Sequence, residues 1–227
     1  MSGFKFIAMI RLLLCLVFTG SFFIQANGQQ QAQTANEHMN QQSFEELVKA
    51  FNSPGRDYWQ KPEEIFKLLG PLKGRKIIDI GCGTGYFSFR LVDSGAIVIA
   101  ADVDDRFLGY VDSVREARNI SAKKLQTRKL PPNDPLIEKR EADIVLIVNT
   151  YHHLEDRVNY LKKIKSGLRS NGFVVIIDYF NKELPIGPPV AMKQSADDIT
   201  RDLKLAGFSF FKTEDKILPY HYIVLSL

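Results

Sequence analysis

The sequence predicts an α/β domain built on a doubly wound, mostly parallel sheet of seven strands. Short β-branched runs alternate with stretches whose apolar residues recur at helical spacing, which is typical of a parallel sheet with helices on both faces. A glycine-rich turn at residues 81–85 joins the first run to the following helix. Acidic residues stand at the ends of the first two runs, where a ligand of such a sheet would lie.

The composition is that of a globular domain. The chain has 227 residues, of which 45% are hydrophobic and 25% charged, and this length is enough for one domain with a core that needs no disulfide. The formal net charge of +4 is small and no long basic run accompanies it. We therefore expect no nucleic-acid partner.

The first 28 residues have the pattern of a secretory signal peptide. Lys5 and Arg11 precede an apolar run over 12–24, and the small residues Ala26 and Gly28 follow it. A positively charged region, an apolar region and small residues in this order predict that the signal peptide is cleaved, here after Gly28, and that the protein is exported to the periplasm or the medium. The run is shorter than the roughly 20 residues of a membrane span, so we expect no stable membrane insertion after cleavage; an uncleaved anchor is the alternative.

The segment before the first strand divides into a linker and two helices. Residues 29–42 are rich in Gln, Asn and Ala without an apolar pattern, which predicts a disordered linker before a domain at 43–227. Ser43, followed three residues later by a glutamate, fits a capping box for a short helix. A loop is expected over 55–62, and a second helix should end at Gly70.

The central motif is a strand, a glycine turn and a helix. Residues 76–80 form the expected strand, and Gly81, Gly83 and Gly85 follow at alternate positions. Glycines let the backbone turn tightly and approach a ligand, and the next helix points its free N–H groups at that ligand. The dinucleotide fingerprint Gly-x-Gly-x-x-Gly would place its third glycine at Tyr86, which disfavours a nicotinamide cofactor.

Two carboxylates flank this turn. Asp79 lies near the end of the first strand, and Asp102 follows the expected strand at 96–101. An acidic residue about 20 positions beyond the turn can accept hydrogen bonds from both hydroxyls of a ribose. Asp104 is expected to cap the next helix.

The later strands bring further polar residues to the same edge. Strands are expected at 123–129 and at 142–148, and the second of these runs into Asn149, His152 and His153. The carboxyl end of a central strand is where ligands bind in open α/β sheets. At least one histidine is expected at the rim of the active site; helix capping and packing against the sheet are the alternative.

The remaining elements complete the alternation of strands and helices. They are a helix to about Leu168 closed by Asn171 and Gly172, a strand at 173–178, an irregular loop at 181–190, a helix from Ser195, and two final strands after Gly207.

The motif Asp79-x-Gly81-Cys82-Gly83-x-Gly85 resembles the first motif of the class I S-adenosylmethionine (SAM) dependent methyltransferases, a Rossmann-like family. The resemblance extends over about 43–227 and includes Asp102 and the segment Leu168-x-x-Asn171-Gly172. The segment His152-His153-Leu154 looks like the corresponding part of the small-molecule methyltransferases of the ubiquinone and menaquinone type. The resemblance implies N-terminal helices over the cofactor and a final antiparallel strand. The cofactor residues that it implies are Asp79, Gly81, Cys82, Gly83, Gly85, Asp102, Val103 and Asn149.

This resemblance implies methyl transfer from S-adenosyl-L-methionine to an oxygen, nitrogen or carbon atom of a small-molecule acceptor. His152 and His153 are then the candidate catalytic residues, on the acceptor side, and no metal is expected. A non-catalytic SAM- or nucleoside-binding protein of the same fold is the alternative, for two reasons. SAM is made in the cytoplasm, and residues 126–131 lack the carboxylate that the family often places near adenine.

Overall fold

The computed structural model describes Met39 and residues 41–227, all within the unit Ala32–Leu227. The predicted signal peptide at 1–28 and most of the predicted linker lie outside the described residues. In the described part, no helix is long and apolar enough to cross a membrane.

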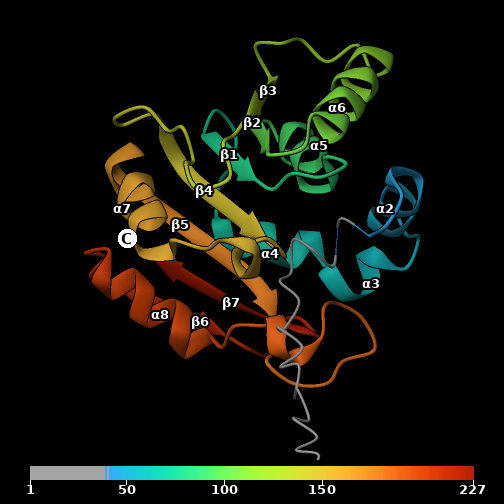
Figure 1. Cartoon of the computed structure of the whole chain (residues 1–227). Helices are drawn as coiled ribbons and strands as arrows, with labels where there is room; N and C mark the ends of the chain where they lie inside the picture. The colour runs from blue at the N-terminus through green and yellow to red at the C-terminus, as the bar shows by residue number, and fades with distance from the viewer. Residues whose placement is uncertain (1–38, 40) are drawn as a thin grey trace, which may run out of the picture. The chain divides into compact units, whose positions relative to one another are not determined.

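The sheet has seven strands in the order β3-β2-β1-β4-β5-β7-β6 (Figure 1). The strands are β1 (Lys76–Ile80), β2 (Ile97–Asp102), β3 (Leu125–Lys129), β4 (Ala142–Val148), β5 (Leu168–Tyr179), β6 (Phe211–Glu214) and β7 (His221–Ser226). Strands β1 to β5 pair in parallel, whereas β7 pairs antiparallel with both β5 and β6. The predicted mostly parallel sheet with an antiparallel last strand is confirmed.

Strand β5 begins earlier than the sequence predicts. Leu168 pairs with Ala142 and Phe173 pairs with Ile144, so the partner strand advances by five residues where β4 advances by two. The irregular segment includes Gly172, where an added Cβ would lie 3.0 Å from the carbonyl oxygen of Ala142. Asn171 and Gly172 therefore lie in an irregularity of the strand and do not close the preceding helix.

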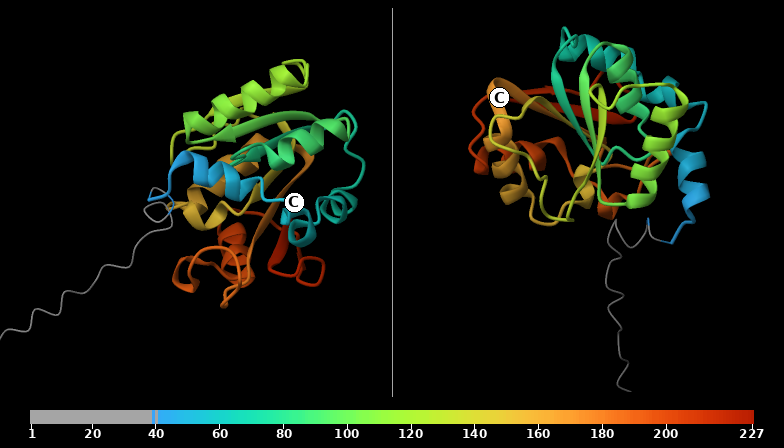
Figure 2. Two further views of the ribbon diagram at one scale, coloured as in Figure 1. Left: turned by 90° about the vertical axis from the view of Figure 1, so that its right-hand side faces the viewer. Right: turned by 90° about the horizontal axis from the view of Figure 1, so that it is seen from above.

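Helices cover both faces of the sheet (Figure 2). They are α2 (Phe44–Phe51), α3 (Arg56–Gln60), α4 (Pro62–Leu69), α5 (Tyr86–Asp93), α6 (Asp105–Ala117), α7 (Arg157–Gly167) and α8 (Ala196–Leu205), with short 3₁₀ turns η1 (Tyr151–His153) and η2 (Val190–Met192). Side chains of α4, α5 and α6 pack against one face, and those of α7 and α8 pack against the other.

The predicted loop at 55–62 is wrong, because it contains helix α3. Pro62 is the first residue of α4, and Lys61 before it adopts φ 41° between the two helices. A residue before proline is disfavoured in the right-handed helical region, which separates α3 from α4 at this point. The capping box predicted at Ser43 and the cap predicted at Asp104 are confirmed. The helix predicted from Ser195 also begins with a capping box at that residue.

The core consists of the two layers between sheet and helices. Ile77, Ile144 and Val175 point to the α4–α6 side, while Ile78 and Val145 point to the α7–α8 side. Because the strands are buried on both faces, they appear in the sequence as continuous apolar runs.

An ionic cluster fixes the amino-terminal end of β4. The buried carboxylate of Glu141 accepts hydrogen bonds from Arg128 Nη2 at 2.6 Å and from Lys76 Nζ at 3.0 Å. The bond from Arg128 is the main cause that lowers the pKa of Glu141 to about 2; burial acts in the opposite direction. This cluster lies at the opposite end of the strand from the residues predicted to form the site.

Candidate functional site

The candidate site lies at the carboxyl edge of the sheet. The glycine turn follows β1, Asp102 ends β2, Asn149 follows β4, and Tyr179 ends β5. Since these strands are parallel, their carboxyl ends share one edge, as the sequence predicts.

The glycine turn is enclosed so closely that side chains are excluded. Gly81, Gly83 and Gly85 have φ angles of 70°, 50° and 77°. A Cβ at Gly81 would lie 2.2 Å from Thr150 Oγ1, and one at Gly83 would lie 3.0 Å from the ring of Phe51. Glycine is therefore required here both for its backbone conformation and for space.

Asp102 links the end of β2 to this turn. Its Oδ2 accepts a hydrogen bond from the Gly83 N–H at 2.9 Å, and its Oδ1 accepts one from the Asp104 N–H at 3.0 Å. Burial raises the pKa of the carboxyl, and these two hydrogen bonds partly oppose the shift. The structure thus places Asp102 against the turn, as predicted, and Val103 beside it is half exposed.

Asp79 lies beneath the turn and joins it to helix α5. Its Oδ2 accepts a hydrogen bond from Ser88 Oγ at 2.6 Å, and the side chain is buried. Burial raises the pKa of Asp79 to about 6, while the Ser88 bond and the charge of Arg56 lower it. Cys82 is buried in the same turn and is the free cysteine of the described chain.

Helix α2 covers the turn, which agrees with the expectation of N-terminal cover helices. Phe51 stacks on Phe107 of α6 with ring centroids 5.4 Å apart. The next residue, Asn52, accepts a hydrogen bond from Thr84 Oγ1 at 2.9 Å and donates one to Tyr110 OH at 3.0 Å. The cover is thereby attached to both the glycine turn and α6.

Arg56 on helix α3 is a partly buried cation that has no carboxylate partner among the described residues. Its Nη1 donates to the Phe51 carbonyl at 2.7 Å, and its guanidinium lies 3.9 Å from the centroid of the Tyr86 ring. Within the described residues no carboxylate pairs with it, and its Nε has no hydrogen-bond partner. Burial lowers the pKa of this group. Nothing in the sequence around Arg56 marks it as a site residue, because its surroundings depend on how α3 packs.

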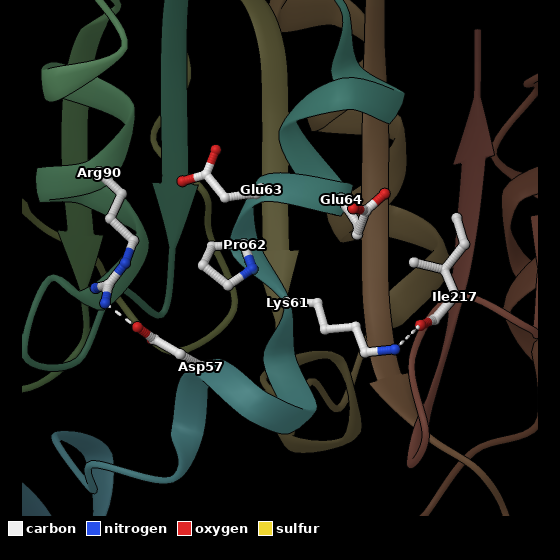
Figure 3. A pocket seen from close by; sticks show the side chains of 7 residues that line it. All are labelled: Asp57, Lys61, Pro62, Glu63, Glu64, Arg90 and Ile217. Atoms are coloured by element: carbon white, nitrogen blue, oxygen red, sulfur yellow. Dashed lines mark hydrogen bonds and ion pairs between the residues drawn. The ribbon is translucent and has the colours of Figure 1, made fainter.

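The outer side of α3 borders a separate pocket of about 590 Å³ (Figure 3). Asp57 accepts from Arg90 Nη2 at 2.9 Å on one wall, and also from the hydroxyl of Tyr86. On the other wall Lys61 Nζ donates to the Ile217 carbonyl at 3.1 Å. None of the predicted site residues lines this pocket, and its contacts anchor α3 and α4 to the domain.

A histidine–aspartate pair stands on the other half of the edge, beyond β4. Asp178 of β5 is buried, and its Oδ1 and Oδ2 lie 2.9 and 3.0 Å from His152 Nδ1. Burial raises the pKa of Asp178, but the charge and hydrogen bond of His152 outweigh burial and lower it below its ordinary value. Asp178 is ionised at neutral pH, so the proton of neutral His152 lies on Nδ1 and the lone pair on Nε2.

His153 lies next to this pair, with its ring centroid 4.3 Å from that of His152. Burial and the charge of the neighbouring His152 lower the pKa of His153 to about 3. The ring of His153 therefore packs beside the His152–Asp178 pair. Helix α7 begins at Arg157 with Asp156 as its N-cap.

Asn149 lies where the two halves of the edge meet. Its backbone has φ 53°, and its Nδ2 donates to Tyr179 OH at 3.2 Å and to Gln60 Oε1 at 3.4 Å. Its Oδ1 is buried without a hydrogen-bond partner. An asparagine tolerates this backbone conformation better than most residues.

The comparison with known proteins identifies a methyltransferase domain. A family model described as a methyltransferase domain matches residues 78–174, from β1 into β5. The structure is similar to a SAM-dependent methyltransferase from Aquifex aeolicus, with a TM-score of 0.74 and 21% identity over 82% of this chain and 98% of that one. The chain therefore contains a methyltransferase domain at residues 78–174, and its fold is that of the SAM-dependent methyltransferases. This domain and this fold support SAM as the cofactor.

Other similar proteins share the fold or one segment. A SAM-dependent methyltransferase from Mesorhizobium loti has a TM-score of 0.62 and 14% identity over 77% of this chain and 98% of that chain. A tRNA U34 carboxymethyltransferase of Pseudoalteromonas translucida is 30% identical over 125 residues, which are 53% of this chain and 37% of that protein. This methyltransferase therefore spans little more than a third of the curated relatives that it matches.

The residues at the edge fit SAM. The glycine turn leaves its backbone N–H groups free of side chains, because a Cβ there would collide with Thr150 or Phe89, and the guanidinium of Arg56, which has no carboxylate partner, suits the carboxylate of the methionine part. The orphaned Oδ1 of Asn149 suits its ammonium group, which can only donate hydrogen bonds. Within the described residues no group of His, Cys, Asp and Glu side chains is placed to hold a metal ion.

Proposed function

We propose that this methyltransferase transfers the methyl group of SAM to a small-molecule acceptor, with His152 as the base that removes the acceptor's proton. The His152–Asp178 pair carries this proposal, because it stands on the β4–β5 side of the edge while the glycine turn and Asp102 stand on the β1–β2 side. A nucleophile bound between them has the cofactor on one side and a base on the other.

The β1–β2 side of the edge, here called the cofactor half, binds SAM and orients its methyl group. Asp102 accepts from the ribose hydroxyls, Arg56 binds the carboxylate, and Asn149 accepts from the ammonium group; the turn of Gly81, Cys82, Gly83 and Gly85 and the neighbouring Val103 complete the wall. The sulfonium of SAM supplies an electrophilic methyl group with a good leaving group. Holding a nucleophile in line with that methyl contributes roughly 7–11 kcal/mol in favourable systems.

The β4–β5 side of the edge, here called the acceptor half, removes the proton of the acceptor. Asp178 holds the imidazole of His152 by Nδ1, which directs the Nε2 lone pair to the acceptor and stabilises the imidazolium that forms. A positioned base of this kind contributes roughly 10²–10⁴-fold when the nucleophile carries a proton. His153, whose pKa is lowered to about 3, is too weak a base to share this role at neutral pH and acts on the acceptor as a neutral group.

A small acceptor suits this chain better than tRNA. The tRNA U34 carboxymethyltransferase of Pseudoalteromonas translucida matches 53% of this chain, and the formal net charge of +4 is small for a polyanion partner. The proposed acceptor is a small nucleophile, and transfer to tRNA is an outcome that the turnover assay below would reveal.

A SAM-binding protein without turnover is the second candidate. Two observations support it. Residues 126–131 contain no carboxylate that could contact adenine. SAM is made in the cytoplasm, so an exported enzyme would need an outside supply of it. Calorimetry with SAM, S-adenosylhomocysteine and NAD tests the ligand, and we expect binding of the first two only. Turnover of labelled SAM with a panel of phenols, quinols, small amines and tRNA then separates an enzyme from a binding protein.

We also propose that the domain acts outside the cytoplasm. The supporting observation is the order of Lys5, Arg11, the apolar run 12–24 and the small residues Ala26 and Gly28. N-terminal sequencing of the native protein should find a start near Gln29. A cytoplasmic protein that retains Met1 would contradict the proposal.

A further inference from the structure

A second pocket, here called the arginine pocket, lies at the amino-terminal edge of the sheet. Its volume is about 530 Å³, and its lining consists of Arg75, Arg140, Asp143, Arg169, Ser170 and Asn171. Arg75 directly precedes β1, Asp143 is the second residue of β4, and Arg169 is the second residue of β5. Since β4 continues for several residues beyond Asp143, roughly 20 Å of strand separate this pocket from the carboxyl edge that binds SAM.

The irregular segment of β5 builds one wall of the arginine pocket. Between Leu168 and Phe173, β5 advances by five residues while β4 advances by two. At Gly172 an added Cβ would lie 3.0 Å from the backbone nitrogen of Arg169, so the backbone folds back tightly here. Residues 169–171 are exposed as a result and face the pocket with their side chains. Such irregularities commonly redirect side chains toward a binding site.

Two of the three arginines in this pocket have no carboxylate partner. Arg169 Nη1 pairs with Asp143 Oδ2 at 2.7 Å. In the described part of the chain no carboxylate pairs with Arg75, whose guanidinium lies 5.9 Å from the centroid of the Phe173 ring, or with Arg140, whose Nη2 donates to Ser170 Oγ at 2.7 Å. Three arginines and one aspartate give the lining a net charge of +2. A pocket lined mainly by one sign of charge attracts the opposite sign, here an anion.

The charge of the lining fits a phosphate monoester. Such a group carries about −1.5 to −2 charges at neutral pH, which balances the net charge of the pocket. A guanidinium group is planar and can donate two parallel hydrogen bonds to phosphate oxygens. Arg75 and Arg140 have such donors available, since neither is bound to a carboxylate.

The rest of the lining indicates what the phosphate is attached to. The volume of about 530 Å³ exceeds the need of a bare phosphate and lies in the range of pockets that bind small organic molecules. All six lining residues have charged or polar side chains, which offer no surface for a nucleobase or an acyl chain. Ser170 Oγ accepts from Arg140 and can still donate its own proton, and the amide of Asn171 can donate and accept. These groups suit hydroxyls.

We propose that the arginine pocket binds the phosphate monoester of a polyhydroxy compound, which is the chemical class of a sugar phosphate. Arg75 and Arg140 donate to the phosphate oxygens, while Ser170 and Asn171 hydrogen-bond to the hydroxyls. Asp143 is not a ligand, because it holds Arg169 in the wall. The inference goes beyond the proposed methyl transfer and does not depend on it, since the two sites lie at opposite edges of the sheet.

The test titrates glucose 6-phosphate, inorganic phosphate and glucose into the full chain by calorimetry at neutral pH and constant ionic strength. The variants are Arg75→Gln, Arg140→Gln and Asn171→Ala. Arg201→Gln is the matched control, because it removes an exposed arginine of α8 that pairs with Asp198 away from the pocket. Backbone N–H signals in NMR locate the ligand on the wild type, and melting temperatures without ligand show whether each variant folds.

We expect glucose 6-phosphate to bind the wild type and Arg201→Gln alike, about threefold or more tightly than inorganic phosphate, and glucose to bind far more weakly. Arg75→Gln and Arg140→Gln should each weaken binding of glucose 6-phosphate by about 10- to 150-fold, which corresponds to lost hydrogen bonds to a charged group. Asn171→Ala should reduce the preference over inorganic phosphate. The N–H signals of residues 169–172 should shift, and those of residues 81–85 should not.

The inference would be overturned by any of four results. Wild type could fail to bind glucose 6-phosphate with a Kd below about 1 mM. Both arginine variants could bind it within about twofold of wild type while folded. Inorganic phosphate could bind as tightly, which would indicate a site for a bare anion, or the shifted signals could lie at residues 81–85. The proposed function fails by other readouts, namely SAM binding and SAM turnover, so the two failures are distinguishable.

Discussion

The carboxylate of Asp178 holds His152 at two points: its Oδ1 lies 2.9 Å from the ring Nδ1, and its Oδ2 accepts the backbone N–H of His152 at 3.2 Å. Both residues are buried. The second contact fixes the backbone that carries the ring, so the carboxylate sets both the position and the tautomer of His152.

Substitution of Asp178 should therefore impair turnover without loss of the cofactor. In Asp178→Asn the introduced amide can donate to Nδ1, which moves the ring proton to Nε2 and removes the lone pair from the acceptor side. We expect SAM affinity within about twofold of the wild type by calorimetry and turnover reduced by roughly 10²–10⁴-fold.

The matched control is Asp143→Asn, which alters a carboxylate at the other end of the sheet that pairs with Arg169. It should leave turnover unchanged. Normal turnover in Asp178→Asn would show that the pair only supports packing.

Asp102 should contribute to both the cofactor and the turn. Asp102→Ala removes the acceptor of the Gly83 N–H and the proposed partner of the ribose hydroxyls. Hydrogen bonds to a charged group contribute roughly 1.5–3 kcal/mol, so the Kd for SAM should rise by about 10- to 150-fold in calorimetry. Asp105→Ala, which alters an exposed carboxylate on α6, is the control. An unchanged Kd in Asp102→Ala would refute this assignment.

Glu141 should make stability depend on acid pH. Its pKa is about 2 in the folded chain, below its ordinary value of 4.5. A lowered pKa means that the carboxylate's contribution is fully present above about pH 4.5 and is lost as the pH falls toward 2. That contribution is at most about 3 kcal/mol.

Urea unfolding of wild type and Glu141→Gln between pH 7 and pH 2 tests this expectation. The wild type should be more stable at pH 7, and the difference in unfolding free energy should shrink toward zero near pH 2. A difference that is constant with pH would contradict it.

Local patterns predicted most elements of the fold and the location of part of the candidate site. The runs at 77–80 and 142–148 are strands because they are buried on both faces, and the glycine turn and the caps at Ser43 and Ser195 depend on neighbouring residues alone. Asp102 could be placed against the turn because the order of strand and turn fixes their common edge.

The rest depends on contacts between distant segments. Several residues that contact Arg56 and His221 are distant from them in the sequence, and nothing in their own neighbourhoods predicts that Arg56 is partly buried and His221 fully buried. Asp178 was recognised only as a strand end, because its partner His152 is 26 positions away and meets it through the pairing of β4 with β5. The same limitation concealed helix α3, whose residues pack on Tyr86 and His221.

The central claim is that His152 is the base of a methyl transfer from SAM, and turnover of labelled SAM by wild type and His152→Gln over a range of pH tests it most directly. With a protonated acceptor found in the panel, we expect His152→Gln to bind SAM normally and to lose roughly 10²–10⁴-fold in turnover near neutral pH. The loss should be smallest at high pH, where the acceptor ionises unaided. Equal turnover per folded molecule of the two proteins at every pH, or loss of SAM binding in folded His152→Gln, would contradict the claim.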